Sequence, residues 1–286
     1  MFPKLLLLIS ISISFSLFAE DLIPTKSGTY DVGGFSLYLE CYENEKPKLI
    51  LEQGFGRSGS DGVWLKNIER LKDDYSICLY DRAGLGKSEK GPIPFTVNDD
   101  VNRLHFLLAV ADIKPPYYFA GGSYASYIIT AYNNLHPNDV LGAVFIAPPT
   151  LGYFYTMGTR WPEDFETENE ELKRYITFEK SVLDPMFKRV PENIDHMKSY
   201  QQIVNASNFG NKPIIVIRPK QTGERYDPLF VPSSIAEKMD TLEKNSESYF
   251  NSLSSNVKIV YSNSEKHHLH ITDSDLVVAK IKELLR

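Results

Sequence analysis

Cysteine is scarce in this chain: only Cys41 and Cys78 occur among 286 residues. Two cysteines cannot form the framework of several disulfides that holds many small secreted domains together. Basic residues are also in deficit, with 31 Lys and Arg against 37 Asp and Glu and a formal net charge of −6. Because the chain is acidic and shows no basic stripe, we expect no nucleic-acid partner.

The sequence also offers no apolar run of the about 20 residues that a membrane-spanning helix needs. The apolar, serine-laced run over residues 5–18 is shorter, follows Lys4 and ends at Ala19 before two acidic residues. This arrangement is typical of an export signal. We therefore expect residues 1–19 to be a signal peptide cleaved near Ala19, and the mature protein to be periplasmic or secreted with no stable membrane span. Leu17 departs from the small-x-small rule at the cleavage site, so an uncleaved anchor stays open as an alternative.

The rest of the chain has the composition of one globular domain, with 42% apolar and 24% charged residues. Segments with strand patterns alternate with segments with helical patterns, which implies crossover connections and a largely parallel sheet. Expected strands cover residues 28–34, 35–42, 48–53, 75–81, 117–120, 140–146, 213–219 and 257–261. Expected helices cover residues 63–71, 97–111, 126–135 and 275–285.

A predicted turn between a strand and a helix carries a serine. The apolar segment 117–120 leads through Gly121-Gly122-Ser123-Tyr124-Ala125 into the helical segment that begins at Ser126. Small residues two positions before and two after Ser123 let a tight turn avoid clashes and present the hydroxyl to solvent. An ordinary Gly-Gly turn before a helix has the same local pattern, so other segments must decide the interpretation.

Four ordered motifs resemble those of the α/β-hydrolases. The first, Gln53-Gly54-Phe55-Gly56, is similar to the family's oxyanion loop, and the second, Tyr80 to Ser88, is similar to its D-x-R-G-x-G-x-S turn. The third is the Ser123 turn, and the fourth is Lys266-His267-His268-Leu269. Gln53 stands where many members have histidine, and Ala83 replaces the usual first glycine. The resemblance covers most of the chain from about Gly28 to Arg286.

The resemblance implies the α/β-hydrolase fold, an α/β architecture with a mostly parallel sheet of about eight strands flanked by helices and a small helical cap. Core residues 28–149 and 212–286 would be separated by the cap, residues 150–211, which is rich in aromatics and shows no strand alternation. In the family's sheet the second and fourth strands are neighbours, so Cys41 and Cys78 form either one bridge or two buried free thiols. The D-x-R turn is structural in this family, so Asp81 and Arg82 are expected to bind loop backbone.

A serine hydroxyl needs a base within hydrogen-bond reach to become a nucleophile. The resemblance implies that Ser123 is the nucleophile and His267 the base, with His268 as the fallback. His267, His268 and His270 lack the helical H-x-x-x-H pair or the cysteine partners typical of a zinc site, so neither a metal nor an organic cofactor is expected.

The acid that orients the base is expected in the loop after the strand at 213–219. Asp227-Pro228-Leu229-Phe230 resembles the family segment that carries this acid, so Asp227 is the predicted acid and Glu224 the alternative. Main-chain N–H groups of Phe55 and Tyr124 would bind the oxyanion of a tetrahedral intermediate.

These motifs predict an exported serine hydrolase that cleaves a carboxylic ester, a small acyl substrate, through an acyl-enzyme on Ser123. A second hypothesis is an aminopeptidase, because Gly121-Gly122-Ser123 followed by an aromatic resembles the elbow of proline iminopeptidases. A third is a catalytically inactive hydrolase-like binding protein, because Gln53, Ala83 and Ala125 depart from the commonest family pattern.

Overall fold

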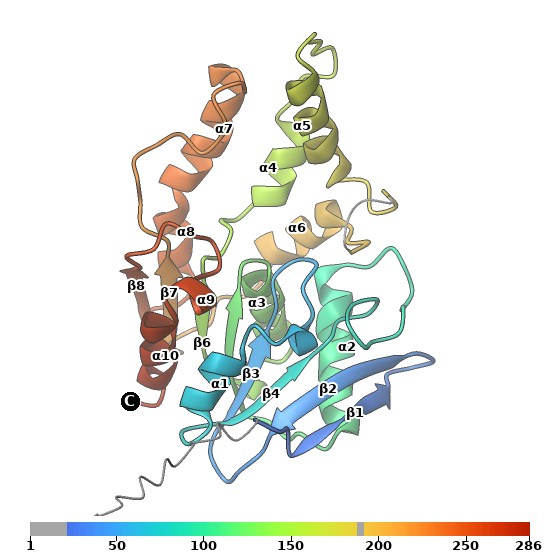
Figure 1. Cartoon of the computed structure of the whole chain (residues 1–286), viewed down its shortest axis with the longest axis vertical. Coiled ribbons are helices and arrows are strands. Elements are labelled where there is room, and N and C mark those ends of the chain that lie inside the picture. The colour runs from blue at the N-terminus through green and yellow to red at the C-terminus, as the bar shows by residue number, and fades with distance from the viewer. Residues whose placement is uncertain (1–21, 188–191) are drawn as a thin grey trace, which may run out of the picture.

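An eight-stranded sheet forms the centre of the computed structural model, which describes residues 22–187 and 192–286 (Figure 1). The strands are β1 (Lys26–Asp31), β2 (Ser36–Tyr42), β3 (Lys48–Glu52), β4 (Ser76–Tyr80), β5 (Tyr117–Gly122), β6 (Val140–Ile146), β7 (Ile214–Arg218) and β8 (Val257–Tyr261). Their order is β1-β2-β4-β3-β5-β6-β7-β8. The predicted signal peptide, residues 1–19, lies outside the described residues.

The sheet is parallel from β4 to β8, which confirms the prediction of a largely parallel sheet, and the first two strands add an antiparallel edge. The turn between β1 and β2 uses Gly33 and Gly34 at φ 111° and 96°, values that glycine adopts without steric cost. The Asp31 carboxylate accepts both of their N–H groups, at 2.7 and 2.8 Å. The tight hairpin therefore follows from Asp31 and the two glycines.

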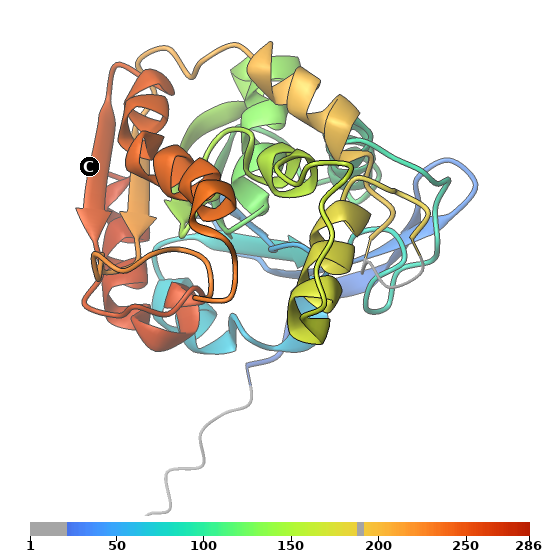
Figure 2. The same cartoon turned by 90° about the horizontal axis from the view of Figure 1, so that it is seen from above.

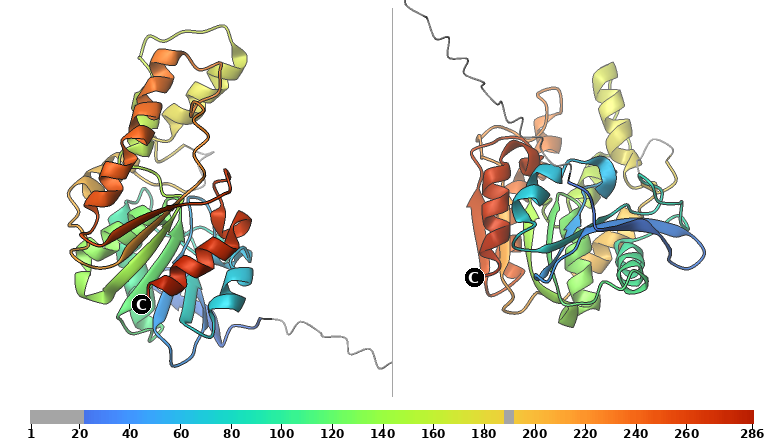
Figure 3. Two further views of the ribbon diagram at one scale, coloured as in Figure 1. Left: turned by 90° about the vertical axis from the view of Figure 1, so that its left-hand side faces the viewer. Right: turned by 60° about the horizontal axis from the view of Figure 1, so that its bottom comes forward.

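Helices cover both faces of the sheet, as the left panel of Figure 3 shows. One face packs against α2 (Val97–Val110) and α3 (Ala125–Leu135), the other against α1 (Leu65–Leu71) and α10 (Ser274–Glu283). Strand β3 contributes side chains to the apolar cores on both faces, because Ile50 packs on the first face while Leu49 and Leu51 pack on the second. The chain thus has the α/β fold with two helical layers that the strand and helix pattern predicted.

Further helices lie above the carboxyl ends of the strands and form a cap. They are α4 (Tyr153–Thr159), α5 (Glu170–Ser181), α6 (His196–Val204) and α7 (Ser233–Lys244). Figures 1 and 2 both show α4 between α5 and α7. Helix α7 comes from the second core segment of the sequence, yet Ile235 and Ala236 share an apolar cluster with Trp161 and Leu172. The cap is therefore built from two separate parts of the chain.

The remaining elements are short connections: η1 (Gly59–Asp61), η2 (Pro137–Asp139), α8 (Ser246–Ser252) and α9 (Leu269–Thr272). Across residues 22–187 and 192–286, no helix is both long and apolar enough to cross a membrane.

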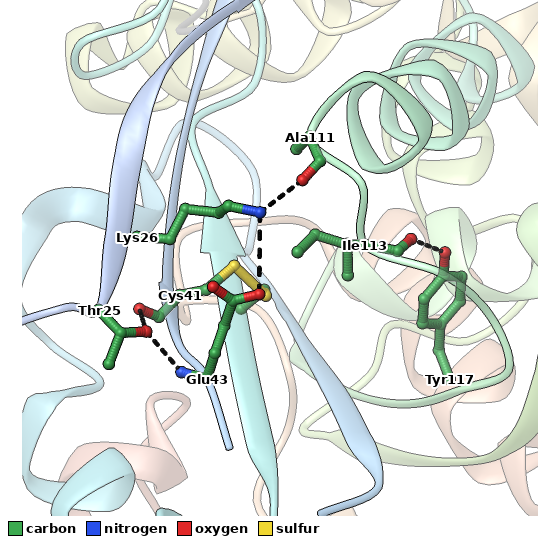
Figure 4. The surroundings of a disulfide bond; sticks show 8 residues. Thr25, Lys26, Cys41, Glu43, Ala111, Ile113 and Tyr117 are labelled. Carbon is green, nitrogen blue, oxygen red and sulfur yellow. Dashed lines mark hydrogen bonds and ion pairs between the residues drawn. A yellow bond between two sulfur atoms is a disulfide. The ribbon is translucent and has the colours of Figure 1, made fainter. Parts of the chain in front are cut away.

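Cys41 and Cys78 form a disulfide between β2 and β4 (Figure 4). The two residues lie directly opposite each other in the antiparallel register, with Cα atoms 4.1 Å apart. Close by, Lys26 Nζ donates a 2.7 Å hydrogen bond to the carbonyl of Ala111 and so ties the edge strand β1 to the end of α2. Of the two alternatives left open by the sequence, the structure contains the bridge.

Candidate active site

Ser123 occupies a strained turn at the carboxyl end of β5. Its φ of 54° lies in the left-handed region that a non-glycine residue adopts at an energetic cost. The Ser123 N–H donates to the carbonyl of Ile146 on the neighbouring strand at 2.8 Å, and α3 begins two residues later. Backbone strain held in place by the sheet is typical of a functional site and supports the predicted nucleophile elbow.

The small residues around Ser123 are required by direct contact between them. A Cβ atom placed on Gly121 would lie 2.4 Å from Ala125 Cβ and 2.9 Å from the carbonyl oxygen of Glu52. Gly121 therefore cannot be larger, and Ala125 already fills the space that the missing Cβ leaves. This close approach is the physical reason for the small-residue spacing seen in the sequence.

Ser123 and His267 line the same two cavities. The larger cavity, of about 1240 Å³, lies under the cap, and the smaller one, of about 140 Å³, lies on the side of the histidine segment. Phe55 also lines both. The structure thus brings the predicted nucleophile and base together at the junction of two cavities, although no hydrogen bond joins their side chains in the part of the chain that it describes.

The His267 ring is suited to accept a proton at neutral pH. Protein atoms that displace water from the ring, together with neighbouring His268, hold the pKa of His267 below its ordinary value of 6.5. Leu269, the residue predicted to be a buried aliphatic, is fully buried and anchors the segment in the core. His268, the fallback base, lines only the smaller of the two cavities.

The predicted oxyanion donors lie on two loops that approach each other closely. A Cβ placed on Gly54 would lie 3.5 Å from Ser123 Cβ, an ordinary van der Waals distance, so the oxyanion loop passes directly beside the nucleophile. No backbone hydrogen bond among the described residues uses the N–H of Phe55 or of Tyr124. Tyr124 is also the N-cap residue of α3, whose N-terminal dipole favours negative charge. Both N–H groups are therefore available to a developing oxyanion.

Arg82 binds the backbone of the oxyanion loop. Its guanidinium donates to the carbonyls of Gln53 and Gly54 at 2.8 and 2.7 Å, and it is ion-paired with buried Glu52 and Glu192. This confirms the prediction that Arg82 binds loop backbone. Asp81 also binds backbone, since its carboxylate accepts hydrogen bonds from the N–H of Lys87 in its own turn and from the N–H of Ser60 in η1.

Glu192 completes this support and was missed by the sequence analysis. Its carboxylate accepts the N–H of Gly56 at 2.6 Å while it binds Arg82, so a residue of the cap segment touches the oxyanion loop directly. No motif marks Glu192, because the contact with Arg82 joins residues 110 positions apart.

The structure does not bring Asp227 to His267. The Asp227 carboxylate is buried and binds the guanidinium of Arg160 through both oxygens, one of them at 2.8 Å, and it accepts the Tyr175 hydroxyl at 2.7 Å. Arg160 in turn binds Glu179 on α5. Asp227 therefore fixes the cap in this conformation. Glu224, the alternative acid, is exposed and lines the larger cavity without a hydrogen bond to His267 within the described residues.

A different set of residues comes closest to a metal site within the described ranges. The ligand atoms of His105, His136 and Asp139 lie within 4.8 Å of one another. The two imidazoles are stacked in parallel, with centroids 3.8 Å apart and planes inclined by 3°. Because ring nitrogens coordinate in the plane of the ring, two stacked rings cannot both point at one ion. This cluster is better described as an aromatic pair.

Comparisons with known proteins agree with this fold. Residues 47–175 match the family model described as alpha/beta hydrolase fold. The uncharacterized protein YqjL of Bacillus subtilis is 25% identical over 199 residues, which are 69% of this chain and 72% of that protein.

Two solved structures are similar over 91% of the chain. A probable hydrolytic enzyme from Pseudomonas aeruginosa has a TM-score of 0.65 with 14% identity and 94% of its own chain covered. A putative lipase from Acinetobacter baumannii has a TM-score of 0.56 with 15% identity and 90% covered. At these identities the likeness concerns the fold. With the parallel sheet, the elbow and the family match over residues 47–175, it shows that the chain has the α/β-hydrolase fold.

Proposed function

We propose that this chain is an exported serine hydrolase that cleaves carboxylic esters through an acyl-enzyme on Ser123. The observation that carries the proposal is the strained position of Ser123 at the junction of two cavities that His267 also lines. The free N–H groups of Phe55 and Tyr124 supply the third requirement of acyl transfer, a site for negative charge.

The proposed reaction uses these groups in sequence. The Ser123 hydroxyl attacks the ester carbon as His267 takes its proton, and the carbonyl oxygen gains negative charge between the two N–H donors. Each such donor lowers the barrier by about 3 kcal/mol in comparable enzymes. His267 then returns the proton to the leaving alcohol, and a water activated in the same way releases the acid from Ser123.

The larger cavity supports an acyl group with apolar character. Its wall includes the side chains of Phe154, Met157 and Val182 together with several charged residues. Its volume of about 1240 Å³ exceeds the roughly 300–1,000 Å³ of typical small-molecule sites. Aliphatic acyl esters are therefore the substrates to test first.

Export rests on two independent features. Residues 1–19 have the pattern of a signal peptide, and the Cys41–Cys78 disulfide is of a kind that persists in oxidising compartments outside the cytosol. Cell fractionation with N-terminal sequencing tests this part: a mature chain that begins near Glu20 outside the cytoplasm supports it, and an intact N-terminus in the cytosol contradicts it.

Hydrolysis of p-nitrophenyl esters by the purified protein tests the reaction. We expect turnover that falls by at least about 10³-fold in Ser123→Ala and in His267→Gln. Faster cleavage of proline p-nitroanilide than of the esters would favour the aminopeptidase hypothesis, which the Gly-Gly-Ser-Tyr elbow suggests. Turnover of neither substrate, with a folded protein, would favour the inactive binding protein.

A further inference from the structure

The larger cavity is enclosed by two segments that lie far apart in the sequence. Helices α4 and α5 supply one part of its wall, with Phe154, Met157 and Phe178 among the lining residues. The loop that follows β7, over residues 219–226, supplies another part together with α7. Figures 1 and 2 place α5 and α7 on opposite sides of α4. The width of the cavity therefore depends on how the two segments are held together.

A network of buried charges joins the two segments. The guanidinium of Arg160, at the end of α4, donates two hydrogen bonds to Glu179 of α5, at 2.8 and 2.6 Å. It donates two more to Asp227, which directly follows the loop, one of them at 2.8 Å. All three side chains are at most 1% exposed. One buried cation thus binds a carboxylate from each segment.

The loop meets α4 and α5 at its last residue and at the residue that follows it. Asp227 accepts the hydroxyl of Tyr175 on α5 at 2.7 Å, in addition to the guanidinium. The hydroxyl of Tyr226 contacts the hydroxyl of Tyr153 on α4, and both tyrosines line the larger cavity. The charge network therefore lies directly beside a contact that belongs to the cavity wall.

Directional bonds distinguish this network from the apolar contacts around it. The segments also share a small apolar cluster, formed by Trp161, Leu172, Val231, Ile235 and Ala236. Apolar contacts are non-directional, so this cluster alone permits small shifts of one segment along the other. Bidentate pairing of a guanidinium with a carboxylate fixes the geometry of both groups. Replacing a buried ion pair by apolar residues is often neutral for stability, so the contribution of the network is to the arrangement of the segments.

We propose that Arg160 is a specificity-determining residue that sets the distance between the two parts of the cavity wall, and so the width of the acyl group that reaches Ser123. This inference rests on the proposed function. Arg160 does not itself belong to the wall formed by the described residues, so it acts through Glu179 and Asp227. Both carboxylates accept from the same nitrogen, Nη2. Without the guanidinium, two neighbouring buried charges of equal sign would repel each other and separate the segments.

Two p-nitrophenyl esters of different acyl width test the inference. The butanoate and the 4,4-diphenylbutanoate share the leaving group and the four-carbon chain, and the second carries two phenyl groups on the last carbon. Arg160→Met removes the charge and keeps an unbranched apolar chain. We expect the ratio of kcat/KM for the wide ester to kcat/KM for the narrow ester to rise about tenfold, the lower end of what a change of fit by one methylene produces. An unchanged or lower ratio in the folded variant overturns the inference.

A control and a milder variant accompany this exchange. Arg174→Met makes the same substitution at an exposed position of α5, and its ratio should equal that of the wild type. If Arg160→Met does not fold, Asp227→Asn supplies the test, because it weakens the bond between the loop and α4 while the guanidinium stays bound to Glu179. The ratio should rise in this variant too, and a wild-type ratio overturns the inference.

Covalent labelling separates this inference from the proposed function. A small fluorophosphonate reacts with an activated serine whatever the width of the cavity. If wild-type Ser123 is labelled but the ratio does not rise in the folded variant, the inference fails and the proposed function stands. If the variant loses labelling and both ester activities in equal proportion, Arg160 supports the chemistry and the inference fails as well. If wild-type Ser123 is not labelled, the proposed function itself fails.

Discussion

The exchange Asp227→Asn should weaken the cap far more than it slows the chemistry at Ser123. In the structure this carboxylate binds Arg160 and Tyr175, all within the buried contact between the β7 loop and the cap. Breaking a buried ion pair by removing one partner typically costs about 3–5 kcal/mol. Glu179 remains on the same guanidinium, so we expect a loss near the lower end of that range, about 3 kcal/mol.

Two measurements on the same variant decide the role of Asp227. Urea unfolding should show the loss of stability, and the rate of fluorophosphonate labelling should stay within about tenfold of the wild-type rate, since Asp227 does not touch His267. An acid that orients the base would instead cost about 10⁴-fold in rate, as loss of the triad carboxylate does in serine proteases. Asp164→Asn, at an exposed position of the cap, is the matched control and should change neither quantity.

Three further predictions follow from contacts away from the nucleophile. Glu192→Ala should slow fluorophosphonate labelling of Ser123 by up to about 10²-fold, because the Gly56 N–H of the oxyanion loop loses its acceptor. Glu192→Gln keeps an acceptor oxygen and should recover most of the labelling rate, so an equal loss in both variants would count against this positioning role. Reduction of the Cys41–Cys78 bridge, which spans 37 residues, should lower the free energy of unfolding by about 4 kcal/mol according to the loop-entropy relation. Urea titration with and without dithiothreitol measures this loss, and no difference between the two titrations would show that the bridge does not form. Urea titrations at several pH values should show the free energy of unfolding falling as the pH drops from 6.5 toward about 4. Burial lowers the pKa values of His196 and His270 to about 4, so the unfolded chain binds protons before the folded chain does. A free energy of unfolding that stays constant over this pH range would contradict the burial of both rings in the neutral form.

The sequence predicted the parts of the fold that depend on local pattern. Strand β3 was expected at 48–53 and covers Lys48–Glu52, because its apolar run serves both helical layers. The elbow was predicted from Gly121, Ser123 and Ala125, since the turn itself requires small neighbours at fixed spacing. Such requirements act over a few residues and are therefore visible in the chain.

Contacts between distant segments were not predictable in the same way. The segment that begins at Asp227 has the local pattern expected of a catalytic acid, but the carboxylate is bound by Arg160, 67 positions earlier, which no pattern near Asp227 reveals. Glu192 supports the oxyanion loop from the cap for the same reason. Gln53 was noted only as a departure from the family's histidine, and its unpartnered amide becomes evident once the buried cavity around it is known.

Peptide mapping after fluorophosphonate treatment is the most direct test of the claim that Ser123 is an activated nucleophile. We expect one phosphonyl adduct, on the peptide that contains Ser123, and its loss in Ser123→Ala. Labelling should also slow sharply below the lowered pKa of His267, because the base is then protonated. An unmodified Ser123 in the folded protein, or an adduct on another residue that persists in Ser123→Ala, would show that Ser123 is not the activated nucleophile.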